Sequence, residues 1–512
     1  MKRSFAADAA HALMCLLVAT YAAVLLQLCI VRLLPAGTLA AAAAFLFLLL
    51  LLLSRRLKNV GITCCSTPAK LPMKPFLLSA ALCFSVLLIY LAAYYPGGLS
   101  SDSITQWHEA KTMSVSDWHP ALHTLLIALL MRIIPSPTFI LVLHMLAYAL
   151  SVGYACAVCL RWGAPRILCV LITLYLSFCP AISNLMTFLW KDCAFAISAM
   201  VLAVQLLQIH LSRGAWLEKH RHVAAFSVTL ALASILRHNG LALTLPAIVW
   251  LFISFPKLFK RLLAAAVCFA LLFTGIRGPL YRAFDVIEKS DTLTEVIGVP
   301  MVVLSHIYVE APESLDEQSI AFLSEFGTWE AFCNNHRTGD WNDTKWYVAS
   351  PSLDGYTLAG IAGMAVRAAL TEPQLAVEAL SGLLDMPLLP FGDAYWRISP
   401  HVTPDNWFGF TPSGIPILGR ILNGICRLSA HPALSWLSWR PGVWLLAVML
   451  FCALLGLHRP LSALTLPAML ICYNLVTCMV LSSPTDFRFF LSTPLIAPLC
   501  LLGLLMHPIS EN

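Results

Sequence analysis

Charged residues are scarce in this sequence. Asp, Glu, Lys and Arg make up 11% of the 512 residues, against about 25% in soluble globular domains. A chain that is also 59% hydrophobic is not an ordinary soluble protein, and apolar runs of about 20 residues, enough to cross a hydrocarbon core of about 30 Å, recur along it. The net charge of +6 lies mostly in short loops between apolar runs. It therefore indicates membrane topology, and we expect no nucleic-acid partner.

Internal repeats are missing, and the cysteines do not form an evident framework. No repeat of 20–50 residues is visible, although transporters are often built from repeated halves. Most of the 17 cysteines lie in apolar runs, where a thiol behaves as a small hydrophobic group. Cys333 and Cys426 lie in a long polar region, where an oxidising compartment would allow a disulfide between them. No small-residue cleavage site follows the first apolar run, so we expect an uncleaved first helix.

The apolar runs predict an all-α polytopic membrane protein with about twelve transmembrane helices and one surface helix. The expected spans are 11–33, 37–53, 75–94, 137–160, 166–187, 192–212, 222–237, 239–255, 261–278, 437–457, 460–482 and 487–507. The expected parts are an N-terminal two-helix addition (1–53), a membrane core (54–278) with a catalytic outer loop (95–134), a mixed extracytoplasmic region of about 150 residues (279–436), and C-terminal transmembrane helices (437–512).

Lys and Arg in the short loops predict the orientation. The loop 54–74 holds five basic residues and no acidic residue, which places it, and both termini, in the cytoplasm. If the apolar segment 119–134 crossed the membrane, the basic loops 161–166 and 213–221 would face outward. We therefore expect this segment to lie flat on the outer surface of a plasma (inner) membrane.

This topology brings polar residues from four places in the chain to the outer face. The loop that follows the third span supplies Asp102, His108, Glu109, Asp117, His119 and His123. Short loops between later spans supply Lys191, Asp192, Arg237, Asp486 and Arg488. A site at the outer membrane surface is the simplest explanation, because intramembrane charges need partners or a function.

Asp102 is the candidate catalytic base for transfer of a sugar to a hydroxyl group, since one carboxylate suffices to take the acceptor proton. A helix N-cap is the alternative role for this residue. Lys191, Arg237 and Arg488 are candidates for binding a donor phosphate, although each basic residue alone is equally typical of a snorkelling anchor. The other polar residues of the outer face would support the site.

His119 and His123 are spaced to share one helix face. That spacing can begin a zinc site, but a third ligand and an intervening Glu are missing from the pair itself. Asp117 or His108 could complete such a site, although we expect the imidazoles to face a polar cavity and bind phosphate or the acceptor. We expect no metal site from the sequence, while a divalent cation stays possible as a cofactor. The stretch 388–412 mixes aromatic residues with Asp, Asn and Gly, which suits sugar binding and equally a membrane-interface belt.

The arrangement resembles the GT-C superfamily of integral-membrane glycosyltransferases, such as the protein O-mannosyltransferases and the lipid A aminoarabinose transferases. The similarity covers about 75–278 and 437–507. The residues that carry it are Asp102 in the first outward loop, His119-Pro120-Ala121-Leu122, and the late run Asp486, Arg488, Phe489 and Pro494. Ala121, Phe489 and Ser103 depart from the family pattern, which more often has Pro, Tyr and an acidic residue.

The resemblance implies a cell-envelope enzyme that uses a polyprenyl-phosphate-linked sugar donor on the non-cytoplasmic face. Its acceptor would be a lipid, a glycan or a protein, and membrane lipids would surround it. Two alternatives are a transporter or flippase of lipid-linked or polar substrates, and a polymerase or ligase of lipid-linked glycans.

Overall fold

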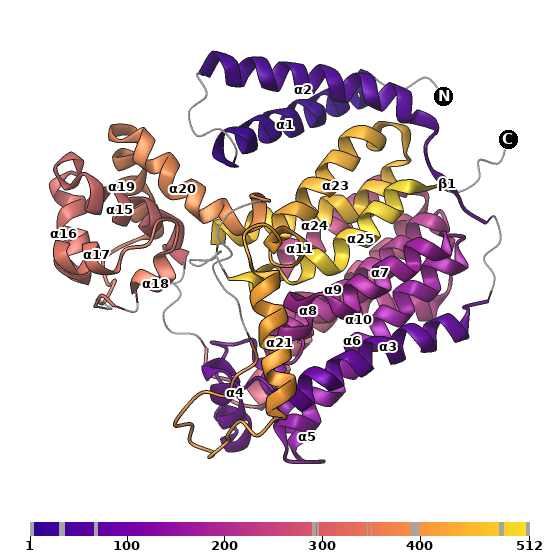
Figure 1. Cartoon of the computed structure of the whole chain (residues 1–512), viewed down its shortest axis with the longest axis horizontal. Helices are drawn as coiled ribbons and strands as arrows, with labels where there is room; N and C mark the ends of the chain where they lie inside the picture. The colour runs from indigo at the N-terminus through magenta and orange to yellow at the C-terminus, as the bar shows by residue number, and fades with distance from the viewer. Residues whose placement is uncertain are drawn as a thin grey trace.

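The computed structural model describes residues 5–29, 36–65, 70–288, 293, 296–345, 347–349, 351–390, 399–480 and 486–507. Within these ranges its regular structure is almost entirely helical (Figure 1). The described sheet is a single parallel pair, β1 (Ile62–Thr63) with β2 (Met506–His507). The predicted all-α class is therefore confirmed.

Eight helical segments in the described ranges are long and apolar enough to cross a membrane. They contain α2 (Ala36–Arg56), α3 (Met73–Ala93), α6 (Pro137–Arg161), α9 (Lys191–Leu211), α12 (Phe259–Gly275), α23 (Pro441–Leu455), α24 (Thr465–Val480), and α25 (Ser492–Leu505) with the preceding turn η8 (Phe487–Phe490). α9 and α25 lie at the centre of the bundle, because 78% of the apolar window of each is buried, against 11% for the segment that contains α2.

The other four predicted spans correspond to helices outside this set of eight. The helices of the bundle outside the eight segments are α1 (Phe5–Cys29), α4 (Ser101–Thr112), α5 (Ala121–Met131), α7 (Arg166–Phe178), α8 (Pro180–Leu185), α10 (His220–Ile235) and α11 (Leu241–Ser254). The π-helical turn η4 (Ile276–Leu280) and α13 (Tyr281–Ala283) continue α12 within its segment. The predicted span 166–187 is divided because Pro180 cannot continue the hydrogen-bond ladder of α7 and instead begins α8. Twelve spans stay a prediction.

The long helices have a polar end and a basic end. α9 rises about 30 Å between them, and Lys191 begins it at the polar end. At the other end, segments from several basic loops meet: Cys65 N donates to Trp162 O (3.4 Å), and Arg459 Nε donates to Leu504 O (2.7 Å). The β1–β2 pair lies at this end, at the right of Figure 1. The basic loops are thus separated from the polar residues, and which end faces the cytoplasm stays a prediction.

The apolar segment 119–134 forms a helix that stays at the polar end. α5 has 11 residues, which is about 16 Å and roughly half of a hydrocarbon core. Both of its flanks lie at the same end, since Lys191 Nζ donates to His119 Nδ1 (2.9 Å) and Thr138 Oγ1 donates to Pro96 O (2.9 Å). α5 therefore packs beside α4 at the lower left of Figure 1 without crossing the bundle.

Much of the region 279–436 forms a separate helical lobe. It consists of α15 (Gly298–Glu310), α16 (Glu317–Phe326), α17 (Trp329–Asn335), α18 (Trp341–Lys345), α19 (Leu358–Thr371) and α20 (Pro373–Leu388). This lobe has its own core, which includes Met301, Phe322 and Trp341, and it lies at the left of Figure 1. Arg440, just before α23, pairs with Asp385 on α20 (2.8 Å) and so joins the lobe to the bundle.

Two further helices, α21 (Pro416–Ser429) and α22 (Ser435–Ser438), lead from the lobe back to the bundle. α21 packs on α3, where Tyr94 Oη donates to Asn423 Oδ1 (3.0 Å). Cys426 is buried on α21, whereas Cys333 is exposed on α17. The disulfide that the sequence left open between these two cysteines is not formed.

Candidate functional site

Asp102 lies in the first turn of α4, and its carboxylate contacts other elements. Ser100 is the N-cap of α4, because its Oγ accepts a hydrogen bond from Ser103 N (3.4 Å). The alternative that Asp102 caps the helix is therefore wrong. Arg488 Nη1 donates to Asp102 Oδ2 (2.8 Å), and Lys191 Nζ lies 3.5 Å from the same oxygen. Two cations from distant parts of the chain thus meet on one carboxylate.

The guanidinium of Arg488 is fixed by two aromatic rings and a second carboxylate. Its central carbon lies 5.1 Å from the ring centre of Trp190 and 5.0 Å from that of Phe489, in the range of cation–π attraction. Arg488 Nε pairs with Asp486 Oδ2 (2.7 Å), and Asp486 Oδ1 accepts from Arg488 N (3.0 Å). Arg488 therefore presents Nη1 to Asp102 in a defined orientation.

Arg237 and Asp192 form a buried ion pair behind these groups. Arg237 Nη1 lies 2.9 Å from Asp192 Oδ1, and the two side chains are 6% and 1% exposed. Arg237 Nε also donates to Asn239 Oδ1 (2.9 Å), and its Nη1 donates to Phe489 O (3.3 Å). Lys191 Nζ lies 4.0 Å from Asp192 Oδ2 and connects this pair to Asp102. The described charged cluster therefore contains three carboxylates and three cations.

The environment sets the protonation of the acidic residues. Burial alone would raise the pKa of Asp102, but Arg488 and Lys191 outweigh it and hold the pKa well below its usual range. Burial raises the pKa of Asp486 above its usual value, although Arg488 opposes that change. Asp102 is therefore firmly ionised, and its basicity is weak as long as both cations stay in contact with it.

The two histidines are neutral and lie on the cluster side of α5. Burial, reinforced by Lys191, lowers the pKa of His119 to about 3. Because Lys191 donates to Nδ1 of this ring, the ring proton belongs on Nε2. Burial also lowers the pKa of His123 to about 3, and its Nδ1 has no hydrogen-bond partner among the described residues. In the described part of the chain, no group of three or more His, Cys, Asp or Glu side chains is placed to hold a metal ion.

His108 and Glu109, which the sequence places in the same site, lie away from the charged cluster. They follow Asp102 by six and seven residues on α4, which is about 10 Å along the helix axis. The ring of His108 packs against Trp407, with 4.8 Å between ring centres. Glu109 Oε1 accepts a hydrogen bond from Ser116 (2.6 Å), and burial raises the pKa of Glu109. Neither side chain is paired with the cations of the cluster.

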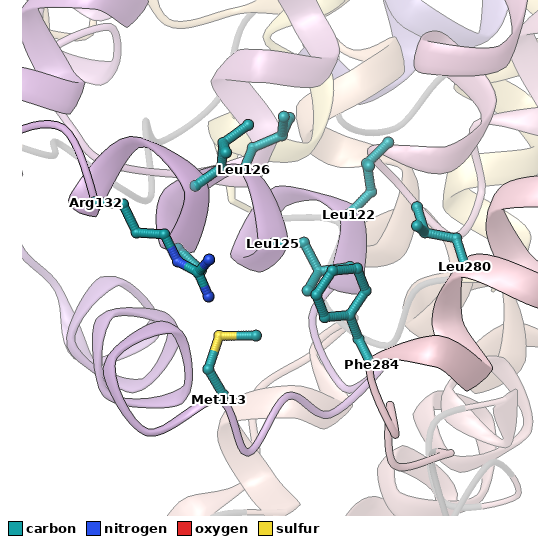
Figure 2. A pocket seen from close by; sticks show the side chains of 9 residues that line it. Met113, Leu122, Leu125, Leu126, Arg132, Leu280 and Phe284 are labelled. Carbon is teal, nitrogen blue, oxygen red and sulfur yellow. The ribbon is translucent and has the colours of Figure 1, made fainter.

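An apolar cleft of about 220 Å³ lies on the other face of α5 (Figure 2). It is lined by Met113, Leu122, Leu125, Leu126, Ala128, Leu129, Arg132, Leu280 and Phe284. Two contacts tie its walls together: Asp117 pairs with Arg277 (2.8 Å), and Leu122 N donates to Tyr281 Oη (3.0 Å). Asp117, predicted to support the charged site, instead fixes α5 to η4 and α13. Among the described residues that line the cleft, Arg132 is the one cation.

Trp190 and Asn239 help to orient the charged cluster and were not identified as site residues in the sequence, where Phe489 was named only for the family resemblance. Trp190 and Phe489 hold Arg488, and Asn239 holds Arg237. Each lies within two residues of a charged residue that the sequence did identify. An aromatic residue next to a basic residue at a helix end was the available signal, since such pairs permit cation–π contacts.

Comparison with known proteins finds a similarity over part of the chain. No curated protein and no solved structure matches it. Residues 106–329 match a family of unknown function (DUF6020). The matched segment begins inside α4 and ends at the start of α17, so it contains His119, Lys191 and Arg237 but neither Asp102 nor Arg488.

Proposed function

We propose that the protein is a membrane glycosyltransferase, which moves a sugar from a polyprenyl-phosphate-linked donor to an acceptor on the non-cytoplasmic face of the plasma (inner) membrane. The observation that carries the proposal is the contact of Asp102 with both Arg488 and Lys191 at one end of the apolar helices. This contact places a candidate base beside two candidate phosphate ligands. The acceptor would be a lipid, a glycan or a protein.

Exposure separates the groups that can meet substrate from those that cannot. The side chains of Asp102, Arg488 and Lys191 are 25%, 22% and 15% exposed. Arg237 and Asp192 are nearly inaccessible, and both Nε and Nη1 of Arg237 already have protein acceptors. We therefore assign the donor phosphate to Lys191 and Arg488. Arg237, which the sequence placed with them, is assigned to hold Asp192.

In the proposed reaction an acceptor hydroxyl oxygen attacks the anomeric carbon of the donor sugar. The bond from that carbon to the phosphate oxygen breaks, and the phosphate leaves with the electron pair. The acceptor proton passes to Asp102. Arg488 and Lys191 stabilise the negative charge that develops on the phosphate, because charge-assisted hydrogen bonds are among the strongest in proteins.

Binding of the donor would itself activate Asp102. In the free protein the two cations depress the pKa of this carboxyl group, which makes it a poor base. A phosphate that shares Arg488 and Lys191 adds negative charge beside Asp102 and weakens both ion pairs. The pKa of Asp102 would then rise toward the range that proton abstraction requires.

The apolar cleft beside α5 favours a lipid-linked donor over a soluble one. Its lining is hydrocarbon apart from Arg132, and His123 on α5 and His119 just before it lie on the side of the charged cluster. A prenyl chain in the cleft would therefore lie against the same short helix that borders the phosphate ligands.

The test uses the full chain in lipid nanodiscs and synthetic polyprenyl-phosphate donors that carry a hexose, a pentose or an aminopentose. We expect the wild type to release polyprenyl phosphate from one of them, and Asp102→Asn to lose at least about 100-fold in rate. Pyrophosphate should bind Asp102→Asn more tightly than wild type, because two cations lose their counter-ion. The exposed residue Glu313 provides the control variant Glu313→Gln, which should leave both measurements unchanged.

Three results would contradict this proposal. Transfer at the wild-type rate by Asp102→Asn would exclude this carboxylate as the base. Weaker pyrophosphate binding by that variant would show that Asp102 organises the cations rather than competing with a phosphate. Release from none of the donors by the wild type would reject the polyprenyl-phosphate class.

A further inference from the structure

The loop 401–410 is fastened to the backbone on the N-terminal side of Asp102. Leu99 N donates to His401 O (2.8 Å), and Thr403 N donates to Leu99 O (2.8 Å). Leu99 immediately precedes Ser100, the cap of α4. The loop then follows α4 toward its C-terminal end, where the edge of Phe410 packs on Trp107 with 5.9 Å between ring centres. In Figure 1 it is the orange loop beside α4 at the lower left.

The side chain of Asn406 makes this loop rigid. Its Nδ2 donates to Thr403 O (3.0 Å) and to Phe410 O (2.8 Å). Its Oδ1 accepts from Phe408 N (3.3 Å) and from Phe410 N (3.0 Å). The side-chain amide of Asn406 thus bonds four backbone groups of the loop and fixes the turn. The residue that follows Asn406 is therefore presented in a set orientation.

That residue is Trp407, whose side chain is 70% exposed. The ring of His108 meets it edge-on, with 4.8 Å between ring centres and 65° between ring planes. Lys111 lies over the neighbouring ring of Phe408, at 5.2 Å from its centre, and Asp405, two residues before Trp407, is exposed. The structure therefore holds a large aromatic side chain open to solvent with an imidazole in contact with it.

We infer that Trp407 and His108 form a carbohydrate subsite, in which a sugar ring of the acceptor stacks on the indole. An aromatic face packs against the CH groups of a pyranose or furanose ring, while the imidazole and nearby polar groups meet its hydroxyls. The inference rests on the proposed glycosyl transfer, in which Asp102 takes the proton of the acceptor. His108 lies on the same helix as Asp102, about 9 Å further along its axis, so the subsite lies close to the proposed base. It narrows the acceptor to a glycan or a glycan-bearing molecule.

A membrane anchor is the competing role for an exposed tryptophan. The surroundings favour sugar, since Lys111 lies over the adjacent ring of Phe408 and Asp405 is exposed two residues before Trp407, and charged groups are costly to place in hydrocarbon. The four hydrogen bonds of Asn406 also fit a binding surface, because an anchor needs no fixed ring orientation. A preorganised ring loses less conformational entropy on binding.

The test measures sugar binding without any donor, and so does not depend on catalysis. The full chain in nanodiscs is applied to an array of immobilised hexose, pentose and amino-sugar oligomers. We expect the wild type to bind one class, Trp407→Ala to bind it at least about tenfold more weakly, and Trp407→Phe to keep most of the affinity. Tyr347 is 68% exposed on the helical lobe, and Tyr347→Ala should bind as the wild type does.

Equal binding by Trp407→Ala, or binding of no oligomer by the wild type, would overturn the inference while the transfer assay with Asp102→Asn stands on its own. The anchor role has a separate measurement. The difference in tryptophan fluorescence between wild type and Trp407→Phe isolates this indole, and it should be the same in nanodiscs of ordinary and brominated lipid. Quenching of that difference signal by brominated chains would place the indole in the bilayer and reject the subsite.

Discussion

Arg237→Gln tests whether the buried ion pair holds the charged cluster together. The substitution leaves the carboxylate of Asp192, which is 1% exposed, with Lys191 at 4.0 Å as its nearest described cation. It also removes the donor to Asn239 Oδ1. Loss of one partner of a buried pair costs about 3–5 kcal/mol of unfolding free energy. Equilibrium unfolding in mixed detergent micelles, followed by tryptophan fluorescence, measures this loss.

Two comparisons show whether burial of an uncompensated charge is the cause. The double variant Arg237→Gln/Asp192→Asn should recover much of the stability, because no charge is then left unpaired. Arg367→Gln breaks an ion pair with Asp316 whose side chains are 51% and 41% exposed, and it should cost less than about 1 kcal/mol. If Arg237→Gln were as stable as wild type but no longer bound pyrophosphate, Arg237 would be a phosphate ligand and its assigned role would be wrong.

Three further predictions concern α5, the apolar cleft and the topology. The pKa of His119 is about 3 in the folded chain against 6.5 ordinarily, so as pH falls the unfolded chain takes up a proton before the folded chain does. The free energy of unfolding should therefore decrease as pH drops from 6.5 to 3, and His119→Gln should make it depend less on pH in an unfolding titration. Leu125→Trp should fill the cleft and raise KM for a long-chain donor, with KM for a two-isoprene donor unchanged. Cysteines placed at the exposed positions Thr112 and Glu218 should react with impermeant maleimide from opposite sides of a vesicle, and labelling of both from one side would contradict the two-ended arrangement.

The sequence was sufficient to predict that the charged residues of the cluster lie at one end of the bundle. Positive charge in short loops determines the direction of each span, and direction alone places Lys191, Arg237 and Arg488 on the side of Asp102. The same argument kept the segment 119–134 at that end, where α5 lies. These inferences succeeded because they need only the order of apolar runs and the sign of the loop charges.

The pairing of those charges was beyond sequence reasoning. Lys191 and Asp192 are neighbours in the chain, yet consecutive helix positions point about 100° apart, so Asp192 faces Arg237 and Lys191 faces Asp102. Likewise, closeness in sequence grouped His108 with Asp102, although α4 carries them apart. Side-chain direction on a helix depends on where the helix begins, and the cap at Ser100 sets that start for α4.

The equality of carboxylates and cations in the cluster explains how so many charges persist at the ends of apolar helices. Each carboxylate, at Asp102, Asp192 and Asp486, has a guanidinium within 2.9 Å, so no net charge is left in a medium that solvates it poorly. Under the proposed reaction this balance also directs the substrate. A donor phosphate is attracted only where a carboxylate can yield its place, and Asp102 offers that place because it is the most exposed of the three carboxylates and contacts both Arg488 and Lys191. Transfer of the acceptor proton to Asp102 then removes the competing negative charge as the phosphate gains its own. In the free protein Asp102 compensates the charges of Arg488 and Lys191. Under the proposed reaction, protonated Asp102 no longer competes for these cations, which would therefore hold the leaving phosphate until Asp102 loses that proton again.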